Sequence, residues 1–256
     1  MSGVPASYWE TLPLGRDVEL VQRDPNGLIA LAKPAGILSH PNAGGDEPRS
    51  LLTVRYHPDG EFYGWTVNSV EHRFYLLNRL DSATSGLLLG ATNEPLAKAV
   101  RALFQRKHIK KIYNALVFGV PTANQQVWKD RLAVEKKAGQ IRTQASAGNI
   151  PAESLMRVVR ARQGTAQPLA LIALEPRTGR SHQLRVQCAK RHLPIVGDAT
   201  YGDFGANRAF AKATGEKRLF LHSLETRFEY VLGNKTFSFS AKAELPKEFS
   251  QAWGKA

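Results

Sequence analysis

The chain has 256 residues, 43% of them hydrophobic and 22% charged, which suits a globular protein with a well-buried core. Its 35 Lys and Arg residues outnumber its 22 Asp and Glu residues, and the net charge of +13 favours a polyanionic partner, either nucleic acid or an anionic membrane. A basic surface that is merely solvated is the alternative. The single cysteine, Cys188, excludes a disulfide framework and any metal site that needs several cysteines, and it is typical of a reducing compartment.

Signals for export or membrane insertion are not found in the sequence. Residues 1–15 contain no basic stretch followed by an apolar one, so we expect no signal peptide. No apolar run approaches the ~20 residues that a membrane-spanning helix needs. The sequence therefore predicts a soluble, cytoplasmic protein, with a lead-in segment over residues 1–24 and one domain over residues 25–256.

The first half of the chain alternates short apolar runs with turns. Residues 27–32 (GLIALA) are predicted to form a buried strand, and the Pro and Gly of residues 33–36 (KPAG) a turn after it. Residues 50–56 are predicted to form a short helix. Strands are predicted at residues 74–77 and 86–91, with a polar turn between them.

A helix is predicted to follow these strands. Asn93 can accept a hydrogen bond at its start, and Glu94 suits the positive end of the helix dipole. Apolar residues then recur at helical spacing from Leu96 to Phe104.

The second half of the chain is richer in strands. Residues 181–191 and 245–253 are predicted to be helical, and residues 140–148 to be a flexible loop. This order lacks the regular alternation of strand and helix found in doubly wound folds, so we expect an α+β fold with a large, mostly antiparallel sheet. The predicted strands cover residues 109–119, 127–134, 154–160, 169–174, 219–229 and 235–240.

The turn over residues 78–86 (NRLDSATSG) carries the most reactive set of side chains. It places the carboxylate of Asp81, the guanidinium of Arg79 and three hydroxyls between two apolar strands. A carboxylate held there could act as a nucleophile or a general base. Alternatively, Asp81 serves to organise the turn through bonds to its own backbone.

Residues 177–185 (RTGRSHQLR) form a second polar stretch, in which Ser181 can cap the following helix. Arg185 lies one turn beyond Ser181, so the two can share a face. An arginine beside Asp81 would lower the pKa of that carboxyl and keep it ionised. The alternative is a surface helix with scattered basic residues.

A third stretch, residues 111–115 (KIYNA), is predicted to be a strand on which Lys111 and Tyr113 share one face. Tyr113 could stack on a nucleobase, or could be an ordinary core tyrosine. The basic residues 106–111 (RKHIKK) could hold phosphates or form a solvated helix end.

These stretches resemble the RluA family of pseudouridine synthases, whose catalytic motif is similar to residues 79–89 (RLDSATSGLLL). The matches follow the family's order from about residue 28 to residue 249, and an ordered set of this kind is highly specific. The other matching motifs are residues 33–36 (KPAG), 111–113 (KIY), 178–185 (TGRSHQLR), 194–202 (PIVGDATYG) and 221–223 (LHS).

The resemblance implies a pseudouridine-synthase-like fold, with two subdomains around a central catalytic cleft, and no metal or organic cofactor. It implies that Asp81 is the nucleophile, that Tyr113 stacks under the target uracil, and that Arg185 pairs with the catalytic carboxylate. Arg79 corresponds to a residue that can occupy the space left by the flipped base. Together with Arg79, the residues implied to bind substrate are Thr84, Lys111, Arg180, His182 and Gln183.

Two positions depart from the family pattern. Asn78 stands where the family usually has a histidine before Arg-Leu-Asp, and Gln187 stands where a histidine usually follows Gln-Leu-Arg-Val. Neither position carries the reaction, so we expect activity to be kept, with an effect on the choice of RNA. Residues 1–24 are too few for the small S4 RNA-binding domain of many relatives, so target choice is expected to rest on the catalytic domain.

The activity that the resemblance implies is isomerisation of uridine in ribosomal or transfer RNA, with Asp81 attacking either C6 of the uracil or C1′ of the ribose. The sequence indicates no obligate protein partner, and we expect a monomer. One alternative is a synthase-like RNA-binding protein without catalysis, which would not need Asp81, Tyr113 and Arg185 together. Another is an unrelated aspartate-dependent hydrolase, which would cleave its substrate.

Overall fold

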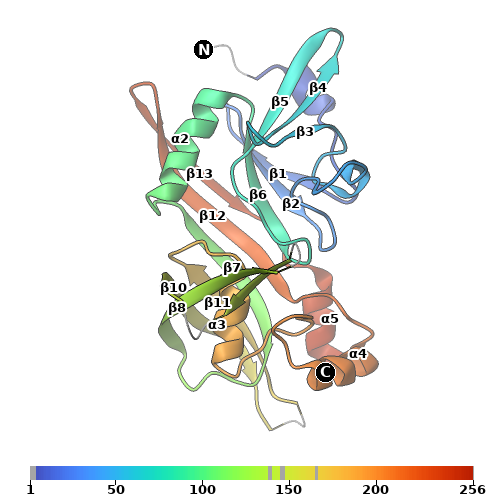
Figure 1. Cartoon of the computed structure of the whole chain (residues 1–256), viewed down its shortest axis with the longest axis vertical. Coiled ribbons are helices and arrows are strands. Elements are labelled where there is room, and N and C mark those ends of the chain that lie inside the picture. Colours follow the sequence, from blue (N-terminus) through green and yellow to red (C-terminus); the bar gives the residue numbers. More distant parts are fainter. Residues whose placement is uncertain (1–3, 138–139, 145–147, 165–166, 256) are drawn as a thin grey trace. The chain divides into compact units, whose positions relative to one another are not determined.

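The computed structural model describes residues 4–137, 140–144, 148–164 and 167–255 (Figure 1). The chain divides into two compact units, of which the first comprises Met1–Ile109 and Glu225–Ala243 and the second Lys110–Leu224 and Glu244–Ala256. In this described part of the chain, no helix is long and apolar enough to cross a membrane.

The first unit is built on antiparallel strands with the order β3-β4-β5-β6-β12. Strand β2 also pairs with β6, β1 pairs with β2, and β13 pairs with β12. The elements are α1 (Ala6–Glu10), β1 (Glu19–Arg23), β2 (Leu28–Lys33), the 3-10 turn η1 (Glu47–Arg49), β3 (Tyr56–His57), β4 (Phe62–Val67), β5 (Val70–Leu76), β6 (Ser85–Ala91), α2 (Glu94–Gln105), most of β12 (Leu221–Leu232), and β13 (Lys235–Lys242).

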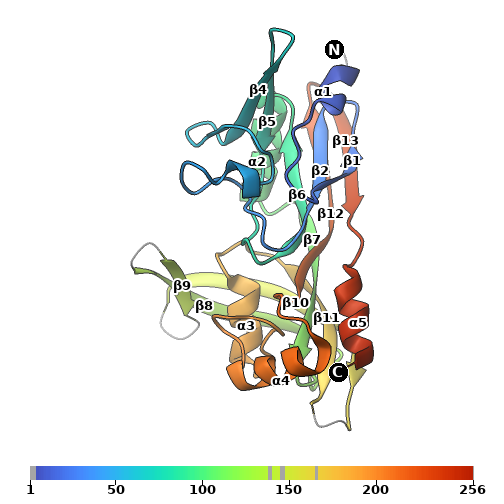
Figure 2. The same ribbon diagram turned by 90° about the vertical axis from the view of Figure 1, so that its right-hand side faces the viewer.

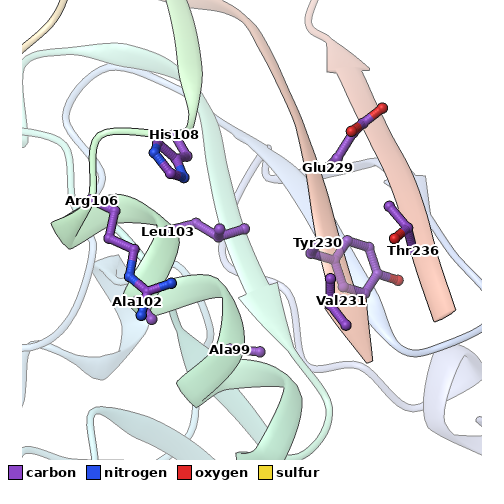
Figure 3. Close-up of a pocket in the computed structure, with 9 residues that line it drawn as sticks. All are labelled: Ala99, Ala102, Leu103, Arg106, His108, Glu229, Tyr230, Val231 and Thr236. Carbon is purple, nitrogen blue, oxygen red and sulfur yellow. The ribbon is translucent and has the colours of Figure 1, made fainter. Parts of the chain in front are cut away.

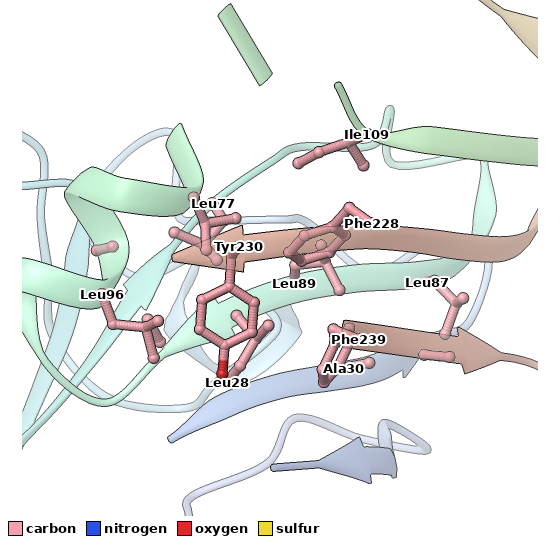
Figure 4. Close-up of a cluster of buried hydrophobic side chains, with 14 of the residues drawn as sticks. Leu28, Ala30, Leu77, Leu87, Leu89, Leu96, Ile109, Phe228, Tyr230 and Phe239 are labelled. Atoms are coloured by element: carbon pink, nitrogen blue, oxygen red, sulfur yellow. The ribbon is translucent and has the colours of Figure 1, made fainter. Parts of the chain in front are cut away.

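Strands β2 and β6 are buried on both faces, which explains why their sequences are apolar without alternation. On one face, Leu28 and Leu89 pack with Phe228, Tyr230 and Phe239 of β12 and β13 (Figure 4). The residues between them along β2 and β6 face the opposite side and join a second hydrophobic cluster. The Asp81 turn therefore leads into a strand that has a packed core on each side.

The second cluster of this unit includes residues from the N-terminal segment. Tyr8 of α1 is buried, packs edge-on against Trp9, and donates a hydrogen bond from its hydroxyl to the Arg73 carbonyl at 2.9 Å. Close packing continues into β6, where a Cβ on Gly90 would lie 2.0 Å from the ring of Phe74. A glycine is therefore required there to let β5 and β6 pack.

Helix α2 begins and ends with recognisable caps. Asn93 accepts a hydrogen bond from the Leu96 amide at 3.0 Å, which confirms the predicted helix start. At the other end, the His108 amide donates to Leu103 O at 2.9 Å and the Lys107 amide to Phe104 O at 3.1 Å. These two bonds form a Schellman motif that ends the helix.

The second unit has the strand order β12-β7-β11-β10-β8-β9, and helix α3 packs against β8 and β9 (Figure 2). Helices α4 and α5 pack against each other. The remaining elements are β7 (Lys110–Phe118), β8 (Gln125–Lys137), β9 (Gln140–Gln144), β10 (Ile150–Arg162), β11 (Leu169–Pro176), α3 (Gln183–Lys190), α4 (Phe204–Thr214) and α5 (Lys247–Lys255). The predicted α+β fold with a large, mostly antiparallel sheet is confirmed.

The prediction of a flexible loop over residues 140–148 is wrong for its first part. Gln140–Gln144 form β9, which pairs antiparallel with β8, while residues 145–147 lie outside the described residues. Thr143 anchors this strand, because its amide donates to the Tyr201 hydroxyl at 2.9 Å and its hydroxyl to the Ser181 carbonyl at 2.9 Å. Those partners are distant in sequence, so the local pattern could not indicate them.

The helix predicted at residues 50–56 is also wrong. The Leu51 amide donates to Leu38 O at 2.8 Å and the Thr53 amide to Pro13 O at 2.9 Å, so backbone bonds to other segments replace helical ones. Strands β1 and β4 and helix α4 were not predicted. The helix expected at residues 181–191 starts at Gln183, because His182 adopts a left-handed φ of 55°.

Candidate active site

The Asp81 turn lies in the first unit, between β5 and β6. Its Thr84 amide donates to the Asp81 carbonyl at 3.0 Å, and the side chain of Asp81 is half-buried. Ser39 fixes the residue before Asp81, since its hydroxyl donates to Leu80 O at 2.7 Å and accepts from the Leu80 amide at 3.0 Å. Both ends of the turn continue into buried strands, which hold the carboxylate in a defined place.

Lys33 connects the KPAG segment with this turn. Its side chain is 1% exposed, and its ammonium group donates to Pro34 O at 2.9 Å, Ile37 O at 2.8 Å and Ser82 O at 3.0 Å. The Gly36 amide also donates to Ser82 O at 2.8 Å. A buried lysine whose ammonium group donates to three carbonyl oxygens stabilises a fixed backbone, because it links the segment after β2 to the Asp81 turn.

Arg79 projects from the same turn and is exposed. Its Nη1 lies 3.3 Å from Nε2 of His40, whose ring stacks on Tyr56 with centroids 4.9 Å apart. His40 Nδ1 lies 2.9 Å from Pro41 O, which fits a tautomer that donates from Nδ1 and accepts from Arg79 at Nε2. His40 and Tyr56 also line a cavity of about 360 Å³.

Asn78, one of the two departures from the family pattern, has a structural role here. Its side-chain oxygen accepts a hydrogen bond from the Leu89 amide of β6 at 2.8 Å. Asn78 therefore holds the start of the turn against the strand that follows it.

Thr84, which was predicted to bind substrate, is buried, with 2% of the residue exposed.

Arg185 lies on α3 in the second unit and is buried against Asp198. Its Nε and Nη2 each donate to one carboxylate oxygen of Asp198 at 2.7 Å, and its guanidinium carbon lies 5.1 Å from the centroid of the Tyr201 ring. Asp198 also accepts from the amides of Thr200 and Tyr201 at 2.9 Å. Although burial acts to raise the pKa of Asp198, these bonds and the charge of Arg185 lower it below its usual value.

The polar residues at the start of α3 bind to the strands beneath it. Gln183 is buried, accepts from the Thr178 hydroxyl at 2.7 Å and from the Arg180 amide at 3.1 Å, and donates to Ser154 Oγ at 3.0 Å. The Arg180 side chain is exposed. His182 Nδ1 lies 2.9 Å from the Tyr201 hydroxyl.

Gln187, the second departure, is fully buried on the same helix. It accepts from the Ser154 hydroxyl at 2.7 Å and donates to Asp130 Oδ2 at 2.8 Å. Asp130 also pairs with Lys190 at 2.8 Å and with Arg191 at 2.9 Å. Gln187 thus links α3 to β8 and β10, so its role in this chain is to place the helix that carries Arg185.

Tyr113 and Lys111 lie on β7, also in the second unit. Tyr113 is buried and stands opposite Leu174 of β11, while Lys111 is half-buried. The predicted strand is confirmed, and residues 111 and 113 share a face by alternation.

The predicted site residues thus fall into two groups. Asp81, Arg79 and Thr84 belong to the first unit, and the other six belong to the second. Within the second unit, His182 and Arg185 are brought together around Tyr201. The joint action of Asp81 with Arg185 and Tyr113 stays a prediction.

Sequence reasoning missed the two partners of Arg185. Asp198 and Tyr201 lie in residues 194–202, which were used as a family landmark and given no role. The signal was present, because an aspartate followed by a turn can accept bonds from the next amides. Among the described residues, no cluster of His, Cys, Asp and Glu is placed to hold a metal ion.

The fold and these motifs define an RNA-modifying isomerase. A sequence model of the family described as RNA pseudouridylate synthase matches residues 27–190, and the chain belongs to that family. It is an RNA pseudouridine synthase, which isomerises uridine to pseudouridine in an RNA substrate, as the RluA-type resemblance predicts.

Curated relatives match over most of their length. The chain is 31% identical to tRNA pseudouridine synthase C of Yersinia pestis over 238 residues, covering 90% of this chain and 88% of that protein. It is 32% identical to tRNA pseudouridine synthase C of Vibrio cholerae, covering 82% of this chain and 85% of that one.

Solved structures confirm the pseudouridine synthase fold. Human RNA pseudouridylate synthase domain containing 4 matches with a TM-score of 0.66 at 21% identity, covering 92% of each chain. Human RNA pseudouridylate synthase domain containing 1 matches with a TM-score of 0.64 at 20% identity, covering 94% of this chain and 96% of that one.

Proposed function

We propose that this synthase modifies transfer RNA and that Asp81 is its nucleophile. The observation that supports the nucleophile most directly is the half-buried Asp81 carboxylate on a turn fixed by Lys33 and Ser39. The transfer RNA substrate is supported by the two relatives, both of which are tRNA pseudouridine synthase C. The domain that performs the reaction is proposed to cover residues 25–256.

In the proposed reaction, the target uridine first leaves its stack, which costs a few kcal/mol. The N1–C1′ bond breaks, the uracil rotates, and C5 bonds to C1′. A base then passes the C5 proton to solvent, and N1 takes up a proton from solvent. Asp81 attacks C6 of the uracil or C1′ of the ribose and is released at the end, so the atoms balance without a co-reactant. Arg185 is proposed to pair with the attacking carboxylate of Asp81.

Each remaining predicted residue has a role in this scheme. Stacking of the uracil on Tyr113 would offset part of the cost of unstacking. After breaking its contact with His40, Arg79 would fill the space that the flipped uridine leaves in the RNA. Thr84, Lys111, Arg180, His182 and Gln183 are proposed to bind the substrate around the uridine.

The deciding experiment compares wild-type protein with Asp81→Asn on unmodified transfer RNA. We expect Asp81→Asn to form no pseudouridine while binding the RNA about as well as wild type. Asp59→Asn, at an exposed residue in the same unit, is the matched control and should keep full activity. Turnover by Asp81→Asn would rule out the nucleophile.

The same experiment separates the alternatives. If the protein is a synthase-like RNA binder without catalysis, even the wild-type protein would leave the uridine content unchanged. If it is a hydrolase, it would release uracil or cut the strand. We also propose that no obligate protein partner is needed, so purified protein should be active. Mapping pseudouridine in transfer and ribosomal RNA from cells with and without the gene would identify the substrate, and lost sites in ribosomal RNA would overturn the transfer RNA proposal.

A further inference from the structure

A groove of about 750 Å³ lies in the first unit, between α2 with the turn after it and strands β12 and β13 (Figure 3). None of the predicted site residues lines it. Its floor is largely apolar, while Arg106 and His108 lie on the α2 side and Glu229 on the strand side. The lining residues are Ala99, Ala102, Leu103, Arg106, His108, Glu229, Tyr230, Val231 and Thr236.

Arg106 and His108 line this groove, and Lys107 lies between them in the chain. All three are exposed, and none forms an ion pair within the described residues. Other cations of α2 are neutralised: Lys98 pairs with Glu94 at 2.7 Å, and Arg101 lies 3.4 Å from Glu61. Unpaired positive charge is therefore concentrated at the end of α2 that borders the groove.

Lys107 adopts a strained backbone conformation at the end of α2. Lys107 has a φ of 61°, the left-handed conformation in which a helix-ending Schellman motif usually has glycine. A side chain with a Cβ is disfavoured there, so folding alone favours glycine over lysine. Such strain often accompanies a functional position, and the charge that lysine adds is the property glycine would lack.

We propose that this groove is a second RNA-binding site, which holds one nucleotide of the substrate RNA and its phosphates away from the target uridine. Arg106, Lys107 and His108 would contact the phosphates, and Ala102 and Leu103 would pack against the base or ribose. Glu229, across the groove, can accept a hydrogen bond from an amino or imino group of the base. This inference rests on the family's RNA substrate, and not on Asp81 or on the choice of transfer RNA.

The test uses total RNA from cells that lack the gene, so that the substrate is present whichever RNA class it belongs to. Binding is measured between 50 and 200 mM salt for wild type, Lys107→Gly and Lys107→Arg. We expect Lys107→Gly to weaken binding about 3- to 10-fold and to reduce the slope of log affinity against log salt by about 1, as loss of one phosphate contact does. Lys107→Arg should bind as wild type does.

Stability and turnover separate this role from a purely structural one. Lys107→Gly should melt at a higher temperature than wild type, because glycine relieves the backbone strain. It should raise KM for RNA and leave kcat unchanged. If Lys107→Gly binds RNA with the affinity and salt slope of wild type, the proposal is wrong, whether or not transfer RNA proves to be the substrate.

A second substitution tests the nucleotide itself. Ala102→Phe would fill the groove without changing its charge, so we expect weaker RNA binding with an unchanged salt slope. Lys212→Gln, which removes an exposed lysine of α4 in the other unit, is the control for charge and should have a smaller effect on affinity than Lys107→Gly. Full affinity of Ala102→Phe would show that no nucleotide enters the groove.

Discussion

Arg185 binds both oxygens of the Asp198 carboxylate, through two donor–acceptor distances of 2.7 Å. The pair is buried, with 8% of Arg185 and 1% of Asp198 exposed. Asp198 therefore fixes the direction of the guanidinium that is proposed to act on Asp81. It does so from a turn whose amides already hold the carboxylate in place.

Replacing Asp198 with asparagine should destabilise the fold and reduce turnover. A buried guanidinium would lose its anionic partner, which typically costs about 3 to 5 kcal/mol. Urea unfolding at pH 7 measures the free energy of unfolding, and a change below about 1 kcal/mol would contradict the prediction. Asp59→Asn, at an exposed residue, is the control.

The effect of this substitution should also depend on pH. The pKa of Asp198 is lowered in the folded protein, so the unfolded chain binds the proton at a higher pH than the folded one. The stabilisation is present above the ordinary pKa of an aspartate and is lost as pH falls through the lower, folded value. The stability difference between wild type and Asp198→Asn should therefore shrink only in strongly acidic solution.

Lys33→Met should impair catalysis without removing a group that is proposed to react. Three carbonyl oxygens would lose a charged donor, and hydrogen bonds of that kind each contribute about 1.5 to 3 kcal/mol. We expect a lower free energy of unfolding and a lower kcat, with a smaller change in RNA affinity. Lys212→Met, at an exposed position, controls for the loss of a positive charge, and equal kcat values for the two variants would argue against this role for Lys33.

Asn78→His should be active, whereas Asn78→Leu should be destabilised by about 1 to 3 kcal/mol, the cost of an unpaired buried amide. A neutral imidazole can accept the Leu89 hydrogen bond that Asn78 now accepts, but leucine cannot. Because a protonated imidazole has no acceptor, Asn78→His should lose stability as pH falls below neutral, and wild type should lose less. Thermal melts at pH 8 and pH 5.5 would show this difference.

His222 should make the wild-type protein less stable in mild acid. Burial and the nearby charge of Arg218 lower the pKa of His222 from 6.5 to about 4. Between these values the unfolded chain binds more protons than the folded one, so stability is lost as pH falls from about 6.5 toward 4. His222→Gln should remove about 2 kcal/mol of the stability difference between pH 7 and pH 5 in urea unfolding, and an unchanged difference would disprove the shift.

Much of the fold could be read from local patterns. The capped start of α2 and the apolar runs of β2 and β6 were predicted, because their signals lie within a few residues. Strand β9 was not, because Thr143 is held by Tyr201 and Ser181, which lie far along the chain.

The residues of the candidate site also differ in whether the local sequence could indicate their roles. Asp81, Tyr113 and Arg185 were singled out as candidates from their local stretches, and their predicted roles came from the resemblance to the family. The roles of Asn78 and Gln187 could not be predicted, because each depends on a buried partner contributed by another element. Asp198 was overlooked although its bonds to the next amides are local, because its side-chain partner Arg185 lies 13 residues away along the chain.

The first unit is formed by two separate stretches of the chain, of which one ends at Ile109 and the other begins at Glu225. Phe228, Tyr230 and Phe239 of its hydrophobic cluster are therefore translated more than a hundred residues after the Asp81 turn. A nascent chain that carries only β1 to α2 exposes the apolar face that these aromatic rings later cover, and the loop that must close is long. Completion of this hydrophobic cluster must consequently wait until β12 and β13 have been translated, and chains cut short before β12 are candidates for aggregation and proteolysis.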